Sequence, residues 1–523
     1  MDPYDLFPYR SVAFPETHPA HLASLGRLFG LNTADPEECR VLEIGCASGG
    51  NLIPMAWHLR GSRFVGIDLS RTQIQAGLAL SRRLKLSNLE LRRADILELG
   101  DDLGELDYIL AHGVYSWVAP AVREHLLGTA GQLLAPGGLL YLSYNALPGW
   151  RMRGMLRDIL LHACRNADTP AAKLDAAHAA LERLTSAIDK LDALSAQYLR
   201  EEIASLRGSH PSYLFFEYLA EHNDAVLFRD FVADCKRHGL RYVCDTELRT
   251  LFPSTYGNQV EQALADIEDG VELEQWLDFV TNRNFRQSLL CRADTPLEDA
   301  IDLERFATLS FYTDLRTSER PDLRCNRPAS FATPGGNRVD VSHPLTKALL
   351  PRLAARYPEC LPLNGQMPAA AREVADAGGS ALAGQVNECL AELFSLFAHR
   401  VLGARPRPLR LEEANLEKPR ASALALAQVA SGASRIATLH HGNLDLDAFA
   451  ARLLGYLDGT RSPEEAAERL AMDLTAGDLK PPSGVAPNQW GRDRLVLRTR
   501  AAVSDLVALF ARYGVLEVEV RSG

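Results

Sequence analysis

Residues 40–56, with the sequence RVLEIGCASGGNLIPMA, decide the fold of this chain. Val41, Leu42 and Ile44 form a short apolar run that is typical of a buried parallel strand. A glycine-rich turn follows, and residues 51–58 have helical spacing. Glycines allow a ligand to approach the backbone, and the first N–H groups of a helix are free to bind it. A strand, a glycine turn and a helix therefore predict a cradle for a phosphate group or a cofactor.

Acidic side chains accompany three successive predicted strands. Glu43 lies in the first strand, directly before the turn, and Asp68 ends the second strand, predicted at 64–67. Asp95 follows the third strand, predicted at 89–92. An acid placed about 20 residues beyond such a turn can accept hydrogen bonds from both ribose hydroxyls of a nucleoside. The three acids predict a nucleoside site along one edge of a sheet.

Strands and helices continue to alternate beyond this region. A fourth strand is predicted at 107–111, and a fifth at 139–143 after the turn 135–138 (APGG). Strands that alternate with helices at this spacing favour an α/β fold with a doubly wound parallel sheet. The ligand of such a sheet binds at the carboxyl ends of its strands.

Glu43 before the first glycine, Asp95 after strand three and the turn 136–138 (PGG) resemble the class I S-adenosylmethionine-dependent methyltransferases. A nicotinamide dinucleotide site would instead need the pattern G-x-G-x-x-G, and position 47 is Ala. Ala47 also departs from the glycine that is usual in the methyltransferase family. The resemblance implies a Rossmann-like sheet and S-adenosylmethionine as cofactor.

The same resemblance assigns the parts of the cofactor. It implies that the glycine turn approaches the methionine part, that Asp68 binds the ribose, and that Asp95 with its neighbour holds the adenine. The cofactor-binding residues that it implies are Glu43, Gly45, Ala47, Gly49, Asn51, Asp68, Leu69, Asp95, Ile96 and His112.

The chain beyond the fifth strand divides into a helical part and two further strands. Helical patterns run from 150 to 206, and we interpret 150–225 as a helical insertion. Strands six and seven are predicted at 239–245 and 285–292, where they complete the sheet. We therefore expect residues 1–295 to form the methyltransferase domain.

A narrower resemblance covers the last part of this domain. The segments 216–219 (FEYL), 228–231 (FRDF), 278–280 (DFV) and 283–287 (RNFRQ) are similar to the methyltransferase regulatory domain, which would span about 210–295. The N-terminal PYRS…THP segment and the stretch HGVYSWV are similar to the same group. That group includes bacterial protein lysine methyltransferases that act on outer-membrane proteins.

From residue 300 on, the pattern of predicted helices and strands differs from that of the sheet domain. Short helices with a strand pair at 300–402 suggest a winged-helix-like middle domain, which the family also carries. Residues 403–411 contain prolines and are predicted to be a linker. A second winged-helix-like domain is expected at 421–523.

Aromatic and polar residues after strands four and five are candidates for the methyl-acceptor site. Tyr115 and Trp117 can form a dry aromatic pocket, which favours a neutral amine and can hold an alkylammonium group. The backbone of His112 can hold the methionine amine, and its ring can accept a proton. Asn145 can orient the nucleophile. For Tyr115, Trp117 and His112, ordinary packing in the core is the alternative.

The paired histidines His440 and His441, with Asp445 and Asp447 nearby, superficially suggest a metal site. Adjacent histidines point in different directions, and no further ligands follow at metal-binding spacing. We expect no metal.

Composition limits the environment and the partners. The 56 basic and 67 acidic residues give a net charge of −11, which disfavours wholesale binding to nucleic acid or to an anionic membrane. The nine cysteines include no C-x-x-C pair, as is usual for reduced thiols in a cytosol. The N-terminal sequence lacks the features of a secretory signal, and no apolar run reaches membrane-spanning length. We expect a soluble, cytoplasmic protein.

Two enzymatic functions and one non-enzymatic function fit these observations. The first is methylation of lysine side chains of a protein substrate. The second is methylation of an amine or hydroxyl of a small molecule, in which the additional domains serve oligomerisation. The third is a cofactor-binding scaffold that recruits partners. Association into a homodimer is a further expectation.

Overall fold

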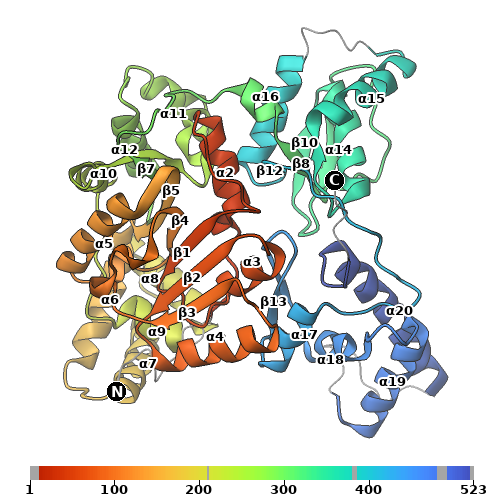
Figure 1. Cartoon of the computed structure of the whole chain (residues 1–523). Helices are drawn as coiled ribbons and strands as arrows, with labels where there is room; N and C mark the ends of the chain where they lie inside the picture. Colours follow the sequence, from red (N-terminus) through yellow and green to blue (C-terminus); the bar gives the residue numbers. More distant parts are fainter. Residues whose placement is uncertain (1–10, 209–210, 380–385, 480–491, 519–523) are drawn as a thin grey trace.

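The structure is a computed structural model that describes residues 11–208, 211–379, 386–479 and 492–518 (Figure 1). A seven-stranded sheet forms the centre of its N-terminal half. The strands are β1 (Arg40–Ile44), β2 (Arg63–Asp68), β3 (Leu89–Arg93), β4 (Leu106–Ala111), β5 (Leu134–Asn145), β6 (Leu240–Asp245) and β7 (Phe285–Arg292).

The strand order is β3-β2-β1-β4-β5-β7-β6. Strands β1 to β5 pair in parallel, whereas β7 runs antiparallel to both β5 and β6. The predicted α/β sheet is confirmed, and its sixth and seventh strands come from the two predicted segments. The order reverses between β1 and β4, and a ligand crevice is expected at the carboxyl ends of these two strands.

Strand β5 is longer than predicted at its N-terminal end. The predicted turn 135–138 lies inside β5, where the pairing with β4 shifts its register between Leu106 and Tyr108. Gly137 adopts a φ of 76°, which an L side chain rarely adopts, and this accommodates the irregularity. The turn that the sequence indicated is therefore a bulge within the strand.

Helices cover both faces of the sheet, as a doubly wound fold requires. Helices α2 (Pro19–Leu28), α3 (Leu52–His58) and α4 (Arg71–Arg83) contribute to the apolar cluster on one face. Helices α5 (Pro120–Leu133) and α10 (Phe228–Arg237) contribute to the cluster on the other face. Helices α11 (Asn258–Ala263) and α12 (Gly270–Thr281) connect β6 to β7.

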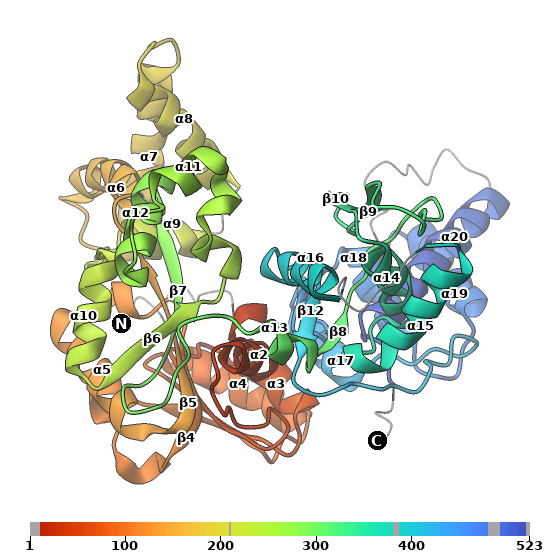
Figure 2. The same cartoon turned by 90° about the horizontal axis from the view of Figure 1, so that it is seen from above.

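The helical insertion forms a lobe with its own apolar core, which projects from the sheet (Figure 2). It consists of α6 (Trp150–Cys164), α7 (Pro170–Ile188), α8 (Leu194–Arg207) and α9 (Pro211–Tyr218). Within the part of the chain that the structure describes, we find no helix whose length and apolar character would let it cross a bilayer.

The middle module combines helices with two small sheets. Its helices are α13 (Leu303–Ala307), α14 (Pro344–Arg356), α15 (Leu363–Asp376) and α16 (Val386–Ala398). Strands β9 (Ala329–Ala332) and β10 (Arg338–Val341) form one sheet, and β8 (Ser310–Tyr312), β11 (Leu361–Pro362) and β12 (Gly403–Arg405) form the other. Since β12 pairs with β8, the first residues of the predicted linker 403–411 belong to this module instead.

In its described residues, the C-terminal module contains four helices and a two-stranded antiparallel sheet. These elements are α17 (Ala423–Ala430), β13 (Arg435–Ala437), β14 (Asn443–Asp445), α18 (Ala448–Tyr456), α19 (Pro463–Ala476) and α20 (Arg492–Arg512). Leu424 and Ala427 of α17 pack against Ile53 and Leu84 next to the glycine turn. The C-terminal module therefore contacts the sheet domain on the side that carries the turn.

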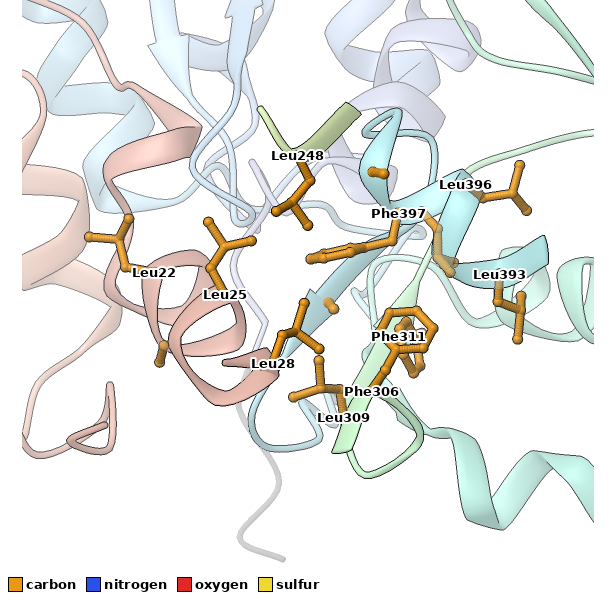
Figure 3. Packing of buried hydrophobic residues seen from close by; sticks show 14 of the residues in the cluster. Leu22, Leu25, Leu28, Leu248, Phe306, Leu309, Phe311, Leu393, Leu396 and Phe397 are labelled. Carbon is orange, nitrogen blue, oxygen red and sulfur yellow. The ribbon is translucent and has the colours of Figure 1, made fainter. Parts of the chain in front are cut away.

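Helix α2 joins the sheet domain to the middle module. Figure 3 shows Leu25 and Leu28 on the side of α2 that faces the middle module, whose side chains there include Phe306, Leu309, Phe311 and Phe397. All of these side chains belong to one continuous buried cluster, which also includes residues of β1, β4 and β5. The two regions share a core across the expected domain boundary.

A buried ion cluster fixes the antiparallel end of the sheet. Arg286 on β7 is 1% exposed, and it donates two hydrogen bonds to Asp278 at 2.8 and 2.9 Å and one to Glu274 at 2.8 Å. Its guanidinium also lies 3.6 Å from the centre of the Phe228 ring. Burial raises the pKa of both carboxyl groups, and the Arg286 charge opposes this effect.

We predict that Arg286→Met lowers the free energy of unfolding by about 3–5 kcal/mol, because removal of one partner leaves two buried carboxyl groups uncompensated. Urea denaturation followed by circular dichroism measures this loss. The matched control is Arg292→Met on the same strand, whose partner Asp294 is 66% exposed. The control is expected to change stability by less than about 0.5 kcal/mol. Equal effects of the two variants would contradict a structural role of the buried cluster.

Candidate functional site

A cavity of about 560 Å³ opens at the carboxyl ends of the parallel strands. One end is lined by the residues around the glycine turn and the ends of β2, β3 and β4. Of the predicted cofactor-binding residues, Gly49 is absent from the lining of this cavity. The structure brings the others together here, namely Glu43, Gly45, Ala47, Asn51, Asp68, Leu69, Asp95, Ile96 and His112.

The glycine turn takes its shape from three residues with positive φ, namely Gly45, Ala47 and Gly49. Gly45 has a φ of 74°, and a Cβ atom there would lie 2.7 Å from Cγ2 of Val114. Ala47 has a φ of 48°, a conformation that disfavours an L side chain by roughly 1 kcal/mol. Its backbone N–H donates a hydrogen bond to Asp68 at 2.8 Å. This conformation explains why glycine is the more usual residue at position 47.

Asp68 and Asp95 are oriented by backbone N–H groups. Asp68 accepts hydrogen bonds from Ala47 and, at 2.8 Å, from Ser70. Asp95 accepts one from Leu97 at 3.0 Å. A carboxylate has about four acceptor positions, so Asp95 retains the capacity to accept hydroxyl or amine donors from a nucleoside.

The environment of the Glu43 carboxyl group indicates whether a cationic cofactor fits this end of the cavity. It is 3% exposed, and its Oε1 accepts a hydrogen bond from Asn51 at 2.8 Å. Its Oε2 is buried and has no hydrogen-bond partner among the described residues. Burial raises the pKa of Glu43 to about 8. An ammonium group in the cavity would satisfy the unpaired oxygen and favour the ionised form, so the residues present fit the methionine end of S-adenosylmethionine.

The side chain of Asn51 connects three segments of the chain. Its Oδ1 accepts hydrogen bonds from the backbone N–H of Phe14 at 2.9 Å and from Nε2 of His441 at 2.7 Å. Its Nδ2 donates hydrogen bonds to Oγ1 of Thr17 at 2.9 Å and to Oε1 of Glu43 at 2.8 Å. Burial lowers the pKa of His441 to about 3, so the ring is neutral. The N-terminal segment and the C-terminal module therefore meet at the cofactor turn.

The paired histidines make separate contacts. His441 binds Asn51, whereas Nε2 of His440 lies 2.8 Å from the carbonyl oxygen of Pro358. The His440 ring also stacks on Tyr312 with 3.6 Å between the ring centres. Each histidine serves as a packing and hydrogen-bonding residue between modules.

The described part of the N-terminal segment lies across the cavity. Ser11 Oγ accepts a hydrogen bond from the backbone N–H of Gly50 at 2.7 Å. The Phe14 ring stacks on His112 with 4.0 Å between ring centres, and Nδ1 of His112 lies 2.8 Å from the Tyr141 hydroxyl. Burial lowers the pKa of His112. Residues 1–10, which include the first three residues of the PYRS…THP segment, lie outside the described residues.

The other end of the cavity is largely aromatic. Beyond Trp117 and Asn145, it is lined by Trp150, Arg153, Tyr213, Phe216, Glu217, His222 and Phe285. Asn145 donates a hydrogen bond from Nδ2 to Asn223 at 2.8 Å, and its Oδ1 is buried without a partner in the described part of the chain. This end can therefore accept a hydrogen bond from a donor that sits among aromatic rings.

Tyr115 differs from its predicted place. It is 2% exposed, is absent from the cavity lining and packs edge-to-face on Phe231 with 5.4 Å between ring centres. Tyr115 and Trp117 both belong to the short helix Tyr115–Trp117, which turns the first ring into the core and the second toward the cavity. Tyr115 is a core residue.

Sequence patterns alone predict no role in the site for His441, Asn223 or Glu217. Glu217 belongs to the FEYL segment, which was recognised as a motif without a chemical role. The contact of His441 with Asn51 spans 390 positions, so no local pattern could have indicated it.

Comparisons with known families and structures agree with this geometry. Residues 42–140 match the model of a methyltransferase domain, residues 210–292 that of a predicted methyltransferase regulatory domain, and residues 417–512 that of a PKMT C-terminal winged helix domain. The structure of PKMT2 from Rickettsia typhi in complex with AdoHcy superimposes with a TM-score of 0.84 at 27% identity, covering 97% of this chain and 100% of that chain. This chain belongs to the S-adenosylmethionine-dependent methyltransferases.

Two relatives in Rickettsia prowazekii extend the comparison. One uncharacterised protein is 29% identical over 495 residues, which is 91% of the methyltransferase and 87% of the relative. A second uncharacterised protein is 35% identical over 234 residues, which is 45% of the methyltransferase and 94% of that relative. The full-length match indicates that the additional modules accompany the sheet domain in related chains.

We predict that binding of S-adenosylmethionine releases about one proton from Glu43 near pH 7. The free carboxyl group, with its pKa near 8, is mostly protonated at this pH, and a bound cation favours the carboxylate. Affinity should therefore rise with pH by up to tenfold per unit between pH 6 and 8, and then level off. Calorimetric titration in buffers of different ionisation enthalpy measures the protons released.

The control is Glu43→Gln, which keeps the shape but cannot titrate. Protons lost by the cofactor itself contribute equally to both proteins, so the difference between them reports Glu43. Identical proton release by the two proteins would remove Glu43 from the cofactor site.

Proposed function

We propose that this methyltransferase transfers the methyl group of S-adenosylmethionine to lysine side chains of a protein substrate. The observation that carries the proposal is the continuity of the cavity, which runs from the acidic end at Glu43 to the aromatic end around Trp117 and Asn145. A long, thin side chain with a terminal amine suits such an aromatic chamber.

The comparisons support this substrate class. PKMT abbreviates protein lysine methyltransferase, and PKMT2 from Rickettsia typhi matches almost the whole chain. The match to a PKMT C-terminal winged helix domain adds a module beyond the cofactor-binding sheet. The two C-terminal modules and the helical lobe offer a surface that a small-molecule enzyme does not need.

The cofactor roles in the proposal are those that the resemblance to the class I methyltransferases implies, and the residues concerned line one cavity. Glu43 and the backbone around His112 hold the methionine part, Asp68 and Leu69 the ribose, and Asp95 and Ile96 the adenine. When bound, S-adenosylmethionine supplies an electrophilic methyl group on a sulfonium. Phe14 lies over His112 and limits access of water to this end.

The acceptor roles fall to Trp117 and Asn145. Methyl transfer is an in-line displacement, so its rate depends on how well the amine is positioned and on its free lone pair. The aromatic surroundings penalise charge and favour the neutral amine. The unpaired Oδ1 of Asn145 accepts a hydrogen bond from the amine and directs the lone pair toward the methyl group.

A cytoplasmic location and a homodimer are further parts of this proposal. All nine cysteines are free thiols, which supports a reducing compartment such as the cytoplasm. Leu191 and Leu194 at the turn between α7 and α8 are 53% and 86% exposed, which supports the expectation of a homodimer through the helical lobe.

The test of this function uses S-adenosylmethionine with a labelled methyl group and the protein fraction of a cell lysate. We expect the label in methylated lysine after acid hydrolysis, and a large loss of label when the lysines are acetylated beforehand. Label in small molecules would support a metabolite methyltransferase instead. Cofactor binding without transfer to either fraction would support the scaffold.

We predict that Trp117→Ala lowers single-turnover methyl transfer by about 10- to 100-fold while cofactor affinity stays near that of the wild type, because the ring positions the acceptor. The matched control is Trp276→Ala, which removes a tryptophan that is 44% exposed on α12. If Trp117 were a core residue, its replacement would lower the free energy of unfolding by about 3–5 kcal/mol, and methyl transfer and cofactor binding would be lost together. A Trp117→Ala enzyme that melts normally and transfers at full rate would remove Trp117 from the site.

A further inference from the structure

Glu217 is an acid at the acceptor end of the cavity that the reaction described so far does not use. It lies in the FEYL segment, near the C-terminal end of α9, and lines the cavity together with Trp117 and Asn145. Among the described residues, no hydrogen-bond donor contacts its carboxylate, whereas its backbone oxygen accepts a hydrogen bond. A half-buried carboxylate inside a largely aromatic chamber invites a cation.

Asn223 ties Glu217 to the end of strand β5. Its Nδ2 donates to the backbone oxygen of Glu217 at 2.6 Å, and its Oδ1 accepts from Nδ2 of Asn145 at 2.8 Å. This link fixes the C-terminal end of α9 relative to Asn145. The unpaired Oδ1 of Asn145 and the carboxylate of Glu217 therefore belong to one chamber, and two acceptors there match a donor with several N–H groups.

The charged groups around Glu217 come from three helices and one loop. Burial raises the pKa of Glu217 to about 7, and the positive charge of Arg153 on α6 opposes this shift. Arg153 also forms an ion pair with Glu202 of α8 at 3.3 Å. The remaining titratable neighbours in this region are Tyr213 and Tyr218 of α9 and His222 of the following loop. A group with a pKa near neutrality can both bind a cation and take up its proton.

His112 is a weaker candidate for this proton transfer. Burial lowers its pKa, its Nδ1 contacts Tyr141, and Phe14 covers its ring. It also lies among the residues at the cofactor end of the cavity.

We propose that the carboxylate of Glu217 binds the ε-ammonium group of the incoming lysine and accepts its proton before methyl transfer, while Oδ1 of Asn145 accepts a second N–H. This role rests on the proposed function, because it assigns the proton that a lysine substrate must lose.

An N–H bond of the ammonium breaks and an O–H bond forms on Glu217, which leaves a neutral amine with a free lone pair. The lone pair then forms the N–C bond to the methyl group as the S–C bond breaks, and the positive charge of the sulfonium passes to the methylated nitrogen. Glu217 releases its proton to solvent, so each turnover yields one proton.

The first test compares Glu217→Gln with the wild type in the lysine-labelling assay across pH. We expect kcat/KM of the wild type to rise through about pH 7 as Glu217 ionises. In Glu217→Gln this rise of kcat/KM with pH should disappear, and kcat/KM at pH 8 should fall by about 100-fold. The cofactor affinity and the melting temperature should stay unchanged. The matched control is Glu221→Gln, the same change at an exposed site just after α9, which should keep the pH profile.

The second test measures binding without turnover. We expect n-butylammonium, titrated into the wild type with S-adenosylhomocysteine present, to bind at least ten times more tightly than to Glu217→Gln. The neutral probe 1-butanol should not distinguish the two proteins. Absence of butylammonium binding to the wild type, or equal binding to both proteins, would overturn the proposal.

The two tests separate this proposal from the proposed function. A wild-type enzyme that labels no lysine contradicts the protein substrate, whatever the variant does. Methyl-lysine formed by Glu217→Gln at the wild-type rate and with the wild-type pH profile would overturn the role of Glu217 and leave the function intact. A variant that only melts at lower temperature, with both the profile and the butylammonium affinity retained, would give Glu217 a structural role.

Discussion

The side chain of Asn51 is the contact on which the arrangement of this methyltransferase depends. One amide group forms hydrogen bonds with Glu43 of β1, with the backbone of Phe14 in the N-terminal segment and with His441 of the C-terminal module. An amide can do this because it donates and accepts without carrying charge, so it remains satisfied in a buried position. The position of the module at the end of the chain is thus coupled through hydrogen bonds to the first turn of the cofactor site.

Shared apolar packing strengthens this coupling. Helix α2 contributes leucines to a core that extends from the sheet into the middle module, and α17 packs against the residues beside the glycine turn. The modules are consequently parts of one packed structure around the sheet. This arrangement gives the additional modules a structural role at the cofactor site besides any contact that they make with a substrate.

The electrostatics of the cavity follow from the charges of the groups it is proposed to bind. Glu43 and Glu217 both line it, and burial raises the pKa of each toward neutrality. Both proposed ligands, a sulfonium cofactor with an ammonium group and a lysine, are cations. A cavity whose carboxyl groups ionise when their cations arrive avoids the large cost of holding unpaired buried charges in the empty state. The buried cluster of Arg286 shows the alternative solution, in which the chain itself supplies the cation.

The sequence by itself determined the sheet and the cofactor end of the cavity. The apolar runs, the glycine turn and the acids near the strand ends are local patterns, and parallel strands carry their carboxyl ends to one edge in any fold of this type. Glu43, Asp68 and Asp95 could therefore be placed together before the structure was known. The tertiary structure alone decided that Trp117 faces the cavity whereas Tyr115 enters the core. It also decided that Asn223 links Glu217 to Asn145, and that His441 reaches Asn51 across 390 positions. These contacts depend on how separate modules pack and on which side of a short turn a ring emerges, and neither leaves a periodic pattern in the chain.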